Sequence, residues 1–101
     1  MAKLPISFHP DARREAEAAF DYYSERSASA ADAFYQALAA SQTAIQDSPQ
    51  SWATYLYGTR RFLLNRFPYL VVYRATDEQI EIVAIAHGRR KPGYWAKRIT
   101  A

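Results

Sequence analysis

The residues best suited to chemistry gather in one stretch, AHGRRKPGYW, at residues 86–95. A histidine with an ordinary pKa of about 6.5 can act as a general base near neutral pH. A guanidinium can hold phosphate oxygens, and a tyrosine hydroxyl can take part in proton transfer. The candidate catalytic residues are therefore His87, Arg90 and Tyr94.

Each histidine and aromatic residue also has a structural interpretation. His87 ends an apolar run and has no identified catalytic partner, so we favour a histidine that bonds a neighbouring carbonyl and fixes the turn. His9 precedes a helix-starting proline and is expected to cap that helix or to lie on the surface. We expect the Pro-Gly turn to fold Tyr94 and Trp95 back onto the sheet, with Trp95 as a core anchor.

Cations dominate the end of the chain and indicate a contact surface. The net charge of +3 divides into −3 for residues 1–50 and +6 for residues 51–101. Residues 87–101 contain no acidic side chain, whereas a merely solvated segment normally mixes signs. The basic half is expected to bind an anionic partner, either a phosphate backbone or an acidic protein segment. The candidate contact residues are Arg61, Arg74, Arg89, Arg90, Lys91, Lys97 and Arg98.

A strand and two helices are predicted ahead of this basic half. Apolar residues alternate over residues 4–8, as in a short strand. They then recur at spacings of three and four over residues 11–25, and again from a serine cap at 27 or 29 to Ile45. Because the connection between the helices is short, we expect an antiparallel helical hairpin.

Three strands follow and define the fold class. Residues 60–65, 69–74 and 79–87 predict a β-meander, so the chain is α+β with strand order β-α-α-β-β-β along the sequence. The hairpin is expected to cover one face of a small, mainly antiparallel sheet and to leave the opposite face free for a partner. Strict alternation places Ile80, Ile82, Ala84 and Ala86 on one face of the last strand, and Glu81, Val83, Ile85 and His87 on the other. The aromatic residues of the loop at 49–58 are expected to pin it to the core; they are Trp52, Tyr55 and Tyr57.

Length and composition limit the function classes. A chain of 101 residues, half of them hydrophobic, is expected to form a single domain over residues 1–101. The chain has no cysteine, which excludes zinc-thiolate sites and a cysteine nucleophile. We expect no cofactor and no metal. Neither a signal peptide nor a membrane span is apparent, so we expect a cytoplasmic protein without a membrane partner.

The sequence from Arg60 onward resembles the RelE/ParE superfamily of toxins from bacterial type II toxin–antitoxin modules. The resemblance is carried by RFPY at residues 66–69, by VYR at residues 72–74 and above all by AHGRRKPGYW. It extends over nearly the whole chain and implies the same α+β fold. It also implies a cognate antitoxin, for which we expect an acidic C-terminal helix, and an assembly that is a homodimer or a heterotetramer with that antitoxin.

The superfamily holds two activities, and the residues favour one of them. RelE-like toxins are ribosome-dependent endoribonucleases that cut mRNA by attack of the ribose 2′-hydroxyl on the adjacent phosphate. Arg90 and Tyr94 match tail positions of that catalytic set, but Leu70 replaces its third-strand arginine and residues 49–65 contain no lysine. The chain is therefore closer to ParE-like toxins, which inhibit DNA gyrase. An mRNA interferase and a toxin-fold interaction protein with weak or lost toxicity stay open as alternatives.

Overall fold

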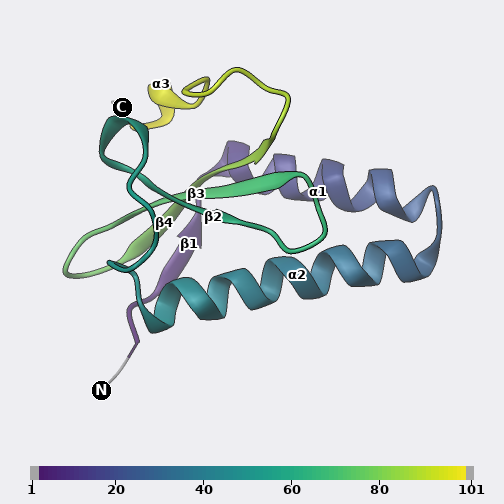
Figure 1. Ribbon diagram of the computed structural model, residues 1–101, viewed down its shortest axis with the longest axis horizontal. Helices are drawn as coiled ribbons and strands as arrows, with labels where there is room; N and C mark the ends of the chain where they lie inside the picture. Colours follow the sequence, from purple (N-terminus) through teal and green to yellow (C-terminus); the bar gives the residue numbers. More distant parts are fainter. Residues whose placement is uncertain (1–2, 100–101) are drawn as a thin grey trace.

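The computed structural model describes residues 3–99, so residues 1–2 and 100–101 of the predicted domain lie outside the described residues. The α+β class and the predicted order of elements are confirmed (Figure 1). A short helix at the C-terminal end was not predicted. The elements are β1 (Ile6–Phe8), α1 (Pro10–Ser24), α2 (Ala28–Asp47), the 3-10 turn η1 (Leu56–Gly58), β2 (Arg60–Leu63), β3 (Tyr69–Ala75), β4 (Ile80–His87) and α3 (Ala96–Ile99).

The four strands form one mixed sheet in the order β1-β4-β3-β2. Strands β2, β3 and β4 are antiparallel neighbours, as the meander predicts. Strand β1 lies parallel to β4, with Ile6 opposite Ile80. Parallel neighbours need a long crossover, and the helical hairpin is part of the chain that connects these two strands. Helix α1 of this hairpin packs against β4 and β1.

Both long helices begin at side-chain caps that the sequence predicts. The Nδ1 atom of His9 accepts a hydrogen bond from the backbone N–H of Asp11 at 3.0 Å, and Pro10 occupies the first helical position. The Ser27 hydroxyl accepts from the N–H of Ala30 at 3.0 Å and starts α2. Figure 1 shows the two helices side by side and antiparallel. No helix within residues 3–99 has the length and hydropathy that a membrane crossing requires.

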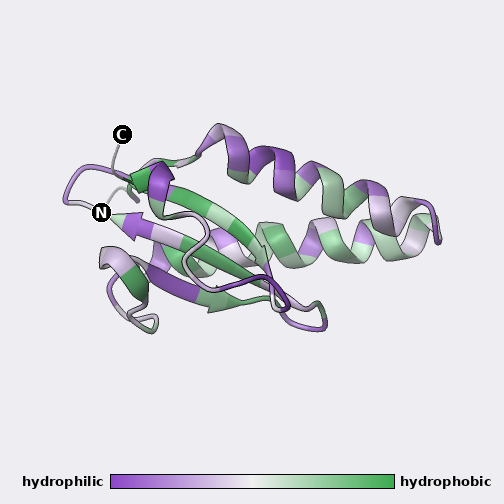
Figure 2. Ribbon diagram, turned by 90° about the horizontal axis from the view of Figure 1, so that it is seen from above, coloured by the Kyte–Doolittle hydropathy of each residue, from purple (hydrophilic) through white to green (hydrophobic). Residues whose placement is uncertain are grey.

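The larger core lies between the hairpin and the sheet. Phe34 and Ile45 of α2 are fully buried there against Val71 and Tyr73 of β3. The Tyr73 hydroxyl donates a hydrogen bond to the carbonyl oxygen of Pro49 at 2.8 Å, so this buried polar group is satisfied. Figure 2 shows mainly hydrophobic central strands and helices with mixed surfaces. The hairpin thus buries its apolar stripes on one face of the sheet.

The predicted division of β4 into two faces is wrong from Ala84 onward. Ile82 lies opposite Tyr73 and Ala84 lies opposite Val72, so Val83 is an extra residue on β4. A β-bulge of this kind reverses the alternation that follows it. Ile85 consequently joins the hairpin-side core, and the residues on the other face are Val83, Ala84 and Ala86.

The second face of the sheet is not free, contrary to the prediction. Residues 88–99, here called the C-terminal segment, fold back over it, and Figure 1 shows them across the sheet from α2. Trp95, only 1% exposed, packs there beside the ring of Tyr55 at 5.4 Å between centroids. The Trp95 core anchor is confirmed. Uncovered apolar surface on β2 includes Leu63, which is 66% exposed.

The loop between α2 and β2 is pinned as predicted, with one exception. The Trp52 indole donates to the Ala44 carbonyl at 3.2 Å and lies edge-on to Phe62, with 4.7 Å between ring centroids. Tyr55 packs under Trp95. Tyr57 is 63% exposed, so its predicted core role is wrong.

Candidate functional site

The turn after β4 is built by His87. Its Nδ1 atom accepts a hydrogen bond from the backbone N–H of Arg89 at 3.1 Å, and its ring lies edge-on to Tyr69 at 5.1 Å. Gly88 donates its N–H to the Pro68 carbonyl at 2.8 Å and ties the turn to the start of β3. His87 therefore fixes the turn, as the structural interpretation predicts. It does so by accepting from a backbone N–H, and the predicted bond to a carbonyl is wrong.

The second turn of the C-terminal segment requires glycine. Gly93 has φ of 88°, and a Cβ atom there would lie 3.0 Å from a ring carbon of Tyr57. This turn brings Tyr94 and Trp95 back onto the molecule, as predicted. Trp95 enters the core, whereas Tyr94 reaches toward α1.

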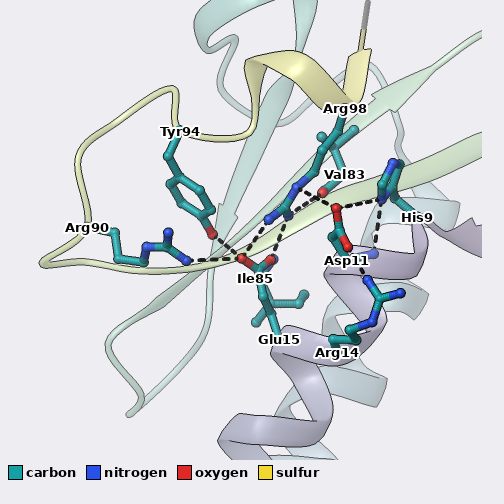
Figure 3. A network of polar contacts seen from close by, with 9 residues as sticks. All are labelled: His9, Asp11, Arg14, Glu15, Val83, Ile85, Arg90, Tyr94 and Arg98. Atoms are coloured by element: carbon teal, nitrogen blue, oxygen red, sulfur yellow. Dashed lines mark hydrogen bonds and ion pairs between the residues drawn. The ribbon is translucent and has the colours of Figure 1, made fainter. Parts of the chain in front are cut away.

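The Glu15 carboxylate of α1 is the centre of the polar network around the segment (Figure 3). Its Oε1 accepts from the backbone N–H of Ile85 at 3.0 Å and from the Arg98 guanidinium at 2.8 Å. Its Oε2 accepts from the Tyr94 hydroxyl at 2.6 Å, from Arg98 at 3.0 Å and from Arg90 at 3.4 Å. Such a two-pronged guanidinium–carboxylate pair is among the stronger polar contacts in proteins. One side chain of the first helix thus holds three side chains of the C-terminal segment.

The network also continues the edge of the sheet. Strand β1 covers β4 only as far as Ile82, where the His9 N–H donates to the Ile82 carbonyl at 2.9 Å. Further along β4, Glu15 accepts from the Ile85 N–H, and Arg98 donates to the Val83 carbonyl at 3.0 Å. The Glu15–Arg98 pair therefore satisfies strand groups where the short β1 has ended.

The pKa values within the network follow from burial and from the Glu15 charge. Burial, the hydrogen bond to Glu15 and its negative charge all raise the pKa of Tyr94, while Arg90 and Arg98 partly oppose the rise. Burial acts to lower the pKa of Arg98, but the bond and charge of Glu15 outweigh it and raise that pKa. The Arg90 guanidinium lies 3.7 Å from the centre of the Tyr94 ring. Tyr94 is consequently a neutral hydrogen-bond donor beside two cations.

The three candidate catalytic residues meet around Glu15, but not as a nuclease set. His87 and Arg90 line a surface hollow of about 260 Å³ together with Glu15. Cleavage by a 2′-hydroxyl needs a base, a cation for the phosphate oxygens and an acid for the leaving oxygen. Here Glu15 pairs with Arg90 and accepts a hydrogen bond from the Tyr94 hydroxyl, and its negative charge opposes a bound phosphate. Within residues 3–99, no group of His, Asp and Glu side chains is arranged to hold a metal ion.

Some of the candidate contact cations are exposed at the surface. Arg89 and Lys91 flank Arg90 on the turn, and within residues 3–99 neither side chain forms an ion pair. Arg61 of β2 is exposed, with its guanidinium 4.8 Å from the centre of the Tyr55 ring. Lys97 is exposed on α3. These four residues form the accessible part of the predicted contact surface.

The other three candidates form ion pairs with acidic side chains of the chain. Arg98 has a side chain only 14% exposed and is bound to Glu15. Arg90 is paired with Glu15 but remains 54% exposed. Arg74 donates to Glu81 at 2.9 Å and to the Ile99 carbonyl at 3.3 Å, which attaches the end of the segment to β3. The basic run therefore contains both structural and available cations.

Glu15 is the site residue that the sequence predictions do not include. It lies three residues after Ala12 and four before Ala19, both of which are buried. That spacing places it on the inward face of α1. An acidic residue on such a face signals a cationic partner elsewhere in the chain.

Known proteins share the sequence and the fold of this chain. Residues 6–92 match the family model described as the ParE toxin of the type II toxin-antitoxin system, parDE. The chain belongs to the ParE toxin family. Toxin ParE2 from two strains of Mycobacterium tuberculosis, CDC 1551 / Oshkosh and ATCC 25618 / H37Rv, is 35% identical to it over 75 residues, which are 73% of this chain and 71% of the relative.

A solved structure supports the fold of this ParE-family chain. The chain of the chromosomal ParDE TA system from P. aeruginosa superposes with a TM-score of 0.71 at 20% identity. The match covers 84% of this chain and 96% of that one. The resemblance to the RelE/ParE superfamily is confirmed on its ParE side.

Proposed function

We propose that this ParE-family toxin inhibits DNA gyrase by binding and carries out no RNA cleavage. The observation that supports this proposal is that Glu15 binds the side chains of both Arg90 and Tyr94. Both residues contact the Glu15 carboxylate, so neither is free for phosphate binding or proton transfer. The same contacts leave Arg89 and Lys91 accessible on the adjacent turn. A surface of this kind suits binding to a macromolecular partner.

The test is a direct comparison of the two target processes in one extract. The purified chain is added to a bacterial transcription–translation extract, and plasmid supercoiling and mRNA integrity are followed together. We expect loss of supercoiling at concentrations that leave mRNA intact. Cleavage of ribosome-bound mRNA with normal supercoiling contradicts the gyrase proposal.

The mRNA interferase is the second candidate, and one observation favours it. His87 and Arg90, two of the three candidate catalytic residues, line the same surface hollow. The extract experiment distinguishes this activity from gyrase inhibition. A chain that affects neither process supports the third alternative, an interaction protein with weak or lost toxicity.

We also propose a cognate antitoxin that neutralises this chain through an acidic C-terminal helix. Family membership supports an antitoxin, and the available cations support its acidic character. The association is expected to weaken as salt rises, because exposed charges are screened beyond about 10 Å at 0.1 M ionic strength. Titration calorimetry of the complex at several salt concentrations measures this dependence. An affinity that salt leaves unchanged contradicts the electrostatic part of the proposal.

A further inference from the structure

We infer that Glu15 is the positioning residue of the C-terminal segment. By holding Arg90 and Arg98 inward, it fixes the turn that presents Arg89 and Lys91 to a partner. The partner-binding half of this inference rests on the proposed function. The segment-holding half concerns the chain alone and is tested separately.

The backbone of the segment supplies little attachment of its own. From residue 89 onward, its backbone–backbone hydrogen bonds within the described chain close inside the segment or on the His87 carbonyl. For example, the Tyr94 N–H donates to the Lys91 carbonyl at 3.3 Å, and the Ala96 N–H donates to the Gly93 carbonyl at 3.0 Å. A segment without strand pairing depends on its side chains for a fixed position.

The apolar anchor of the segment is incomplete. Trp95 is buried, but its indole N–H finds no acceptor within residues 3–99. A buried donor without a partner reduces the net gain from packing the ring. Trp95 alone therefore holds the segment less firmly than its buried area indicates.

Glu15 supplies the missing attachment from the other end of the sequence. It is separated by 75 residues from Arg90 and by 83 residues from Arg98. Its side chain is 15% exposed and that of Arg98 is 14% exposed, so water screens their interaction weakly. Removing the Glu15 charge leaves the largely buried Arg98 guanidinium with only the Asp11 carboxylate at 3.8 Å and the Val83 carbonyl as partners, which is unfavourable where the segment now lies.

The experiment compares Glu15→Gln with Glu17→Gln by hydrogen-exchange mass spectrometry on the full chain. Glu17 lies two residues further along α1 and is exposed, so it receives the same chemical change outside the network. In Glu15→Gln we expect exchange in residues 88–99 to be roughly tenfold faster or more, with the α2 and β3 peptides unchanged. Glu17→Gln is expected to match the parent throughout.

Two results overturn the segment-holding half. One is equal exchange in the two variants. The other is a uniform rise over all peptides, which assigns Glu15 to overall stability. If Glu15→Gln fails to fold, Tyr94→Phe removes a single hydroxyl donor from the network and decides the question. It is expected to speed exchange by severalfold in residues 88–99 only, and unchanged exchange there contradicts the inference.

Gyrase inhibition tests the partner-binding half. We expect Glu15→Gln to need about tenfold more protein than Glu17→Gln for the same loss of supercoiling, because its cations are no longer held in place. A loosened segment with unchanged inhibition overturns this half. If the parent chain itself does not inhibit gyrase, the proposed function fails while the exchange result on Glu15 stands.

Discussion

The two faces of the sheet are covered in different ways. The hairpin face is packed by two helices of 15 and 20 residues whose apolar stripes meet the strands directly. The opposite face is covered by the C-terminal segment, whose only helix has four residues. Trp95 and the Glu15 network attach that segment. One face is therefore stabilised by broad apolar burial and the other by a few specific contacts.

This difference separates the scaffold of the toxin from its proposed contact surface. A helix with a buried apolar stripe tolerates little change in its core positions but many changes outside them. A segment attached by a few side chains is sensitive to substitution of those side chains, and its other residues are free for binding. Arg89 and Lys91 belong to the free group, whereas Arg98 belongs to the attachment.

The largest expected effect distinguishes the two faces by their aromatic anchors. Phe34→Ala on the hairpin face is expected to cost about 3–5 kcal/mol of unfolding free energy, typical of a buried phenylalanine. Trp95→Ala is expected to cost less, about 2–4 kcal/mol, because it also removes the unsatisfied indole N–H. Urea denaturation of both variants measures the difference. A Trp95→Ala variant less stable than Phe34→Ala contradicts the ranking of the two faces.

A smaller effect concerns the buried tyrosine of the hairpin face. Burial raises the pKa of Tyr73 to about 12 from 10.0, with the Arg60 charge acting in the opposite direction. Because the folded state holds this proton more tightly, its contribution to stability is complete below about pH 10 and is lost as pH rises toward 12. Thermal melts of the parent chain between pH 9 and pH 12 are expected to show this loss.

Tyr73→Phe tests whether the Tyr73 hydroxyl causes this loss of stability at alkaline pH. The variant loses the hydrogen bond to Pro49, which costs about 1 kcal/mol near neutral pH. The stability that it loses at alkaline pH is expected to be smaller than that of the parent, and the part that remains is assigned to Tyr23, Tyr69 and Tyr94, whose pKa values are also raised. The exposed Tyr57→Phe serves as the control and should follow the parent. If the parent and Tyr73→Phe lose the same stability between pH 9 and pH 12, the titration of Tyr73 is ruled out as a cause.

Leu70→Arg tests whether Leu70 alone prevents this chain from cleaving mRNA. Leu70 lies opposite Ala86 in the sheet and is only partly buried, so we expect a stability change below about 1 kcal/mol. We also expect no mRNA cleavage, since Glu15 still engages Arg90 and Tyr94 and no lysine lies in residues 49–65. Primer extension on ribosome-bound mRNA is the measurement. Robust cleavage by this variant, with none by the parent, shows that Leu70 alone had blocked the reaction.

Local patterns in the sequence predicted the elements of this fold well. The helix caps at His9 and Ser27 and the anchoring role of Trp95 follow from side-chain chemistry and position. The bulge at Val83 was not predictable, because residues 82–86 are all apolar and such a run does not show which face each residue occupies. Only the pairing with β3 shows where the extra residue lies.

The site was harder to predict than the fold, because its central contact joins distant parts of the chain. A count of charges by halves treats Glu15 as part of an acidic surface and Arg98 as part of a basic one. The fold brings them together, so some of the basic run is neutralised internally. The sequence shows where the cations are, but not which of them remain available.

Charge reversal of the two available turn cations tests the central claim most directly. In Arg89→Glu/Lys91→Glu, Arg90 is kept because a glutamate there would face Glu15 and disturb the attachment. Both side chains are exposed, so the melting behaviour should match the parent within about 0.5 kcal/mol. The control is Arg26→Glu, which reverses a cation beside Tyr22 at the far end of the hairpin.

The measurement is inhibition of gyrase supercoiling by the parent, the double variant and the control. We predict that the folded double variant needs at least about tenfold more protein than the parent, since charged surfaces govern the encounter with a partner, while Arg26→Glu inhibits normally. A folded Arg89→Glu/Lys91→Glu variant that inhibits gyrase as well as the parent contradicts the claim that the C-terminal segment is the contact surface of this toxin.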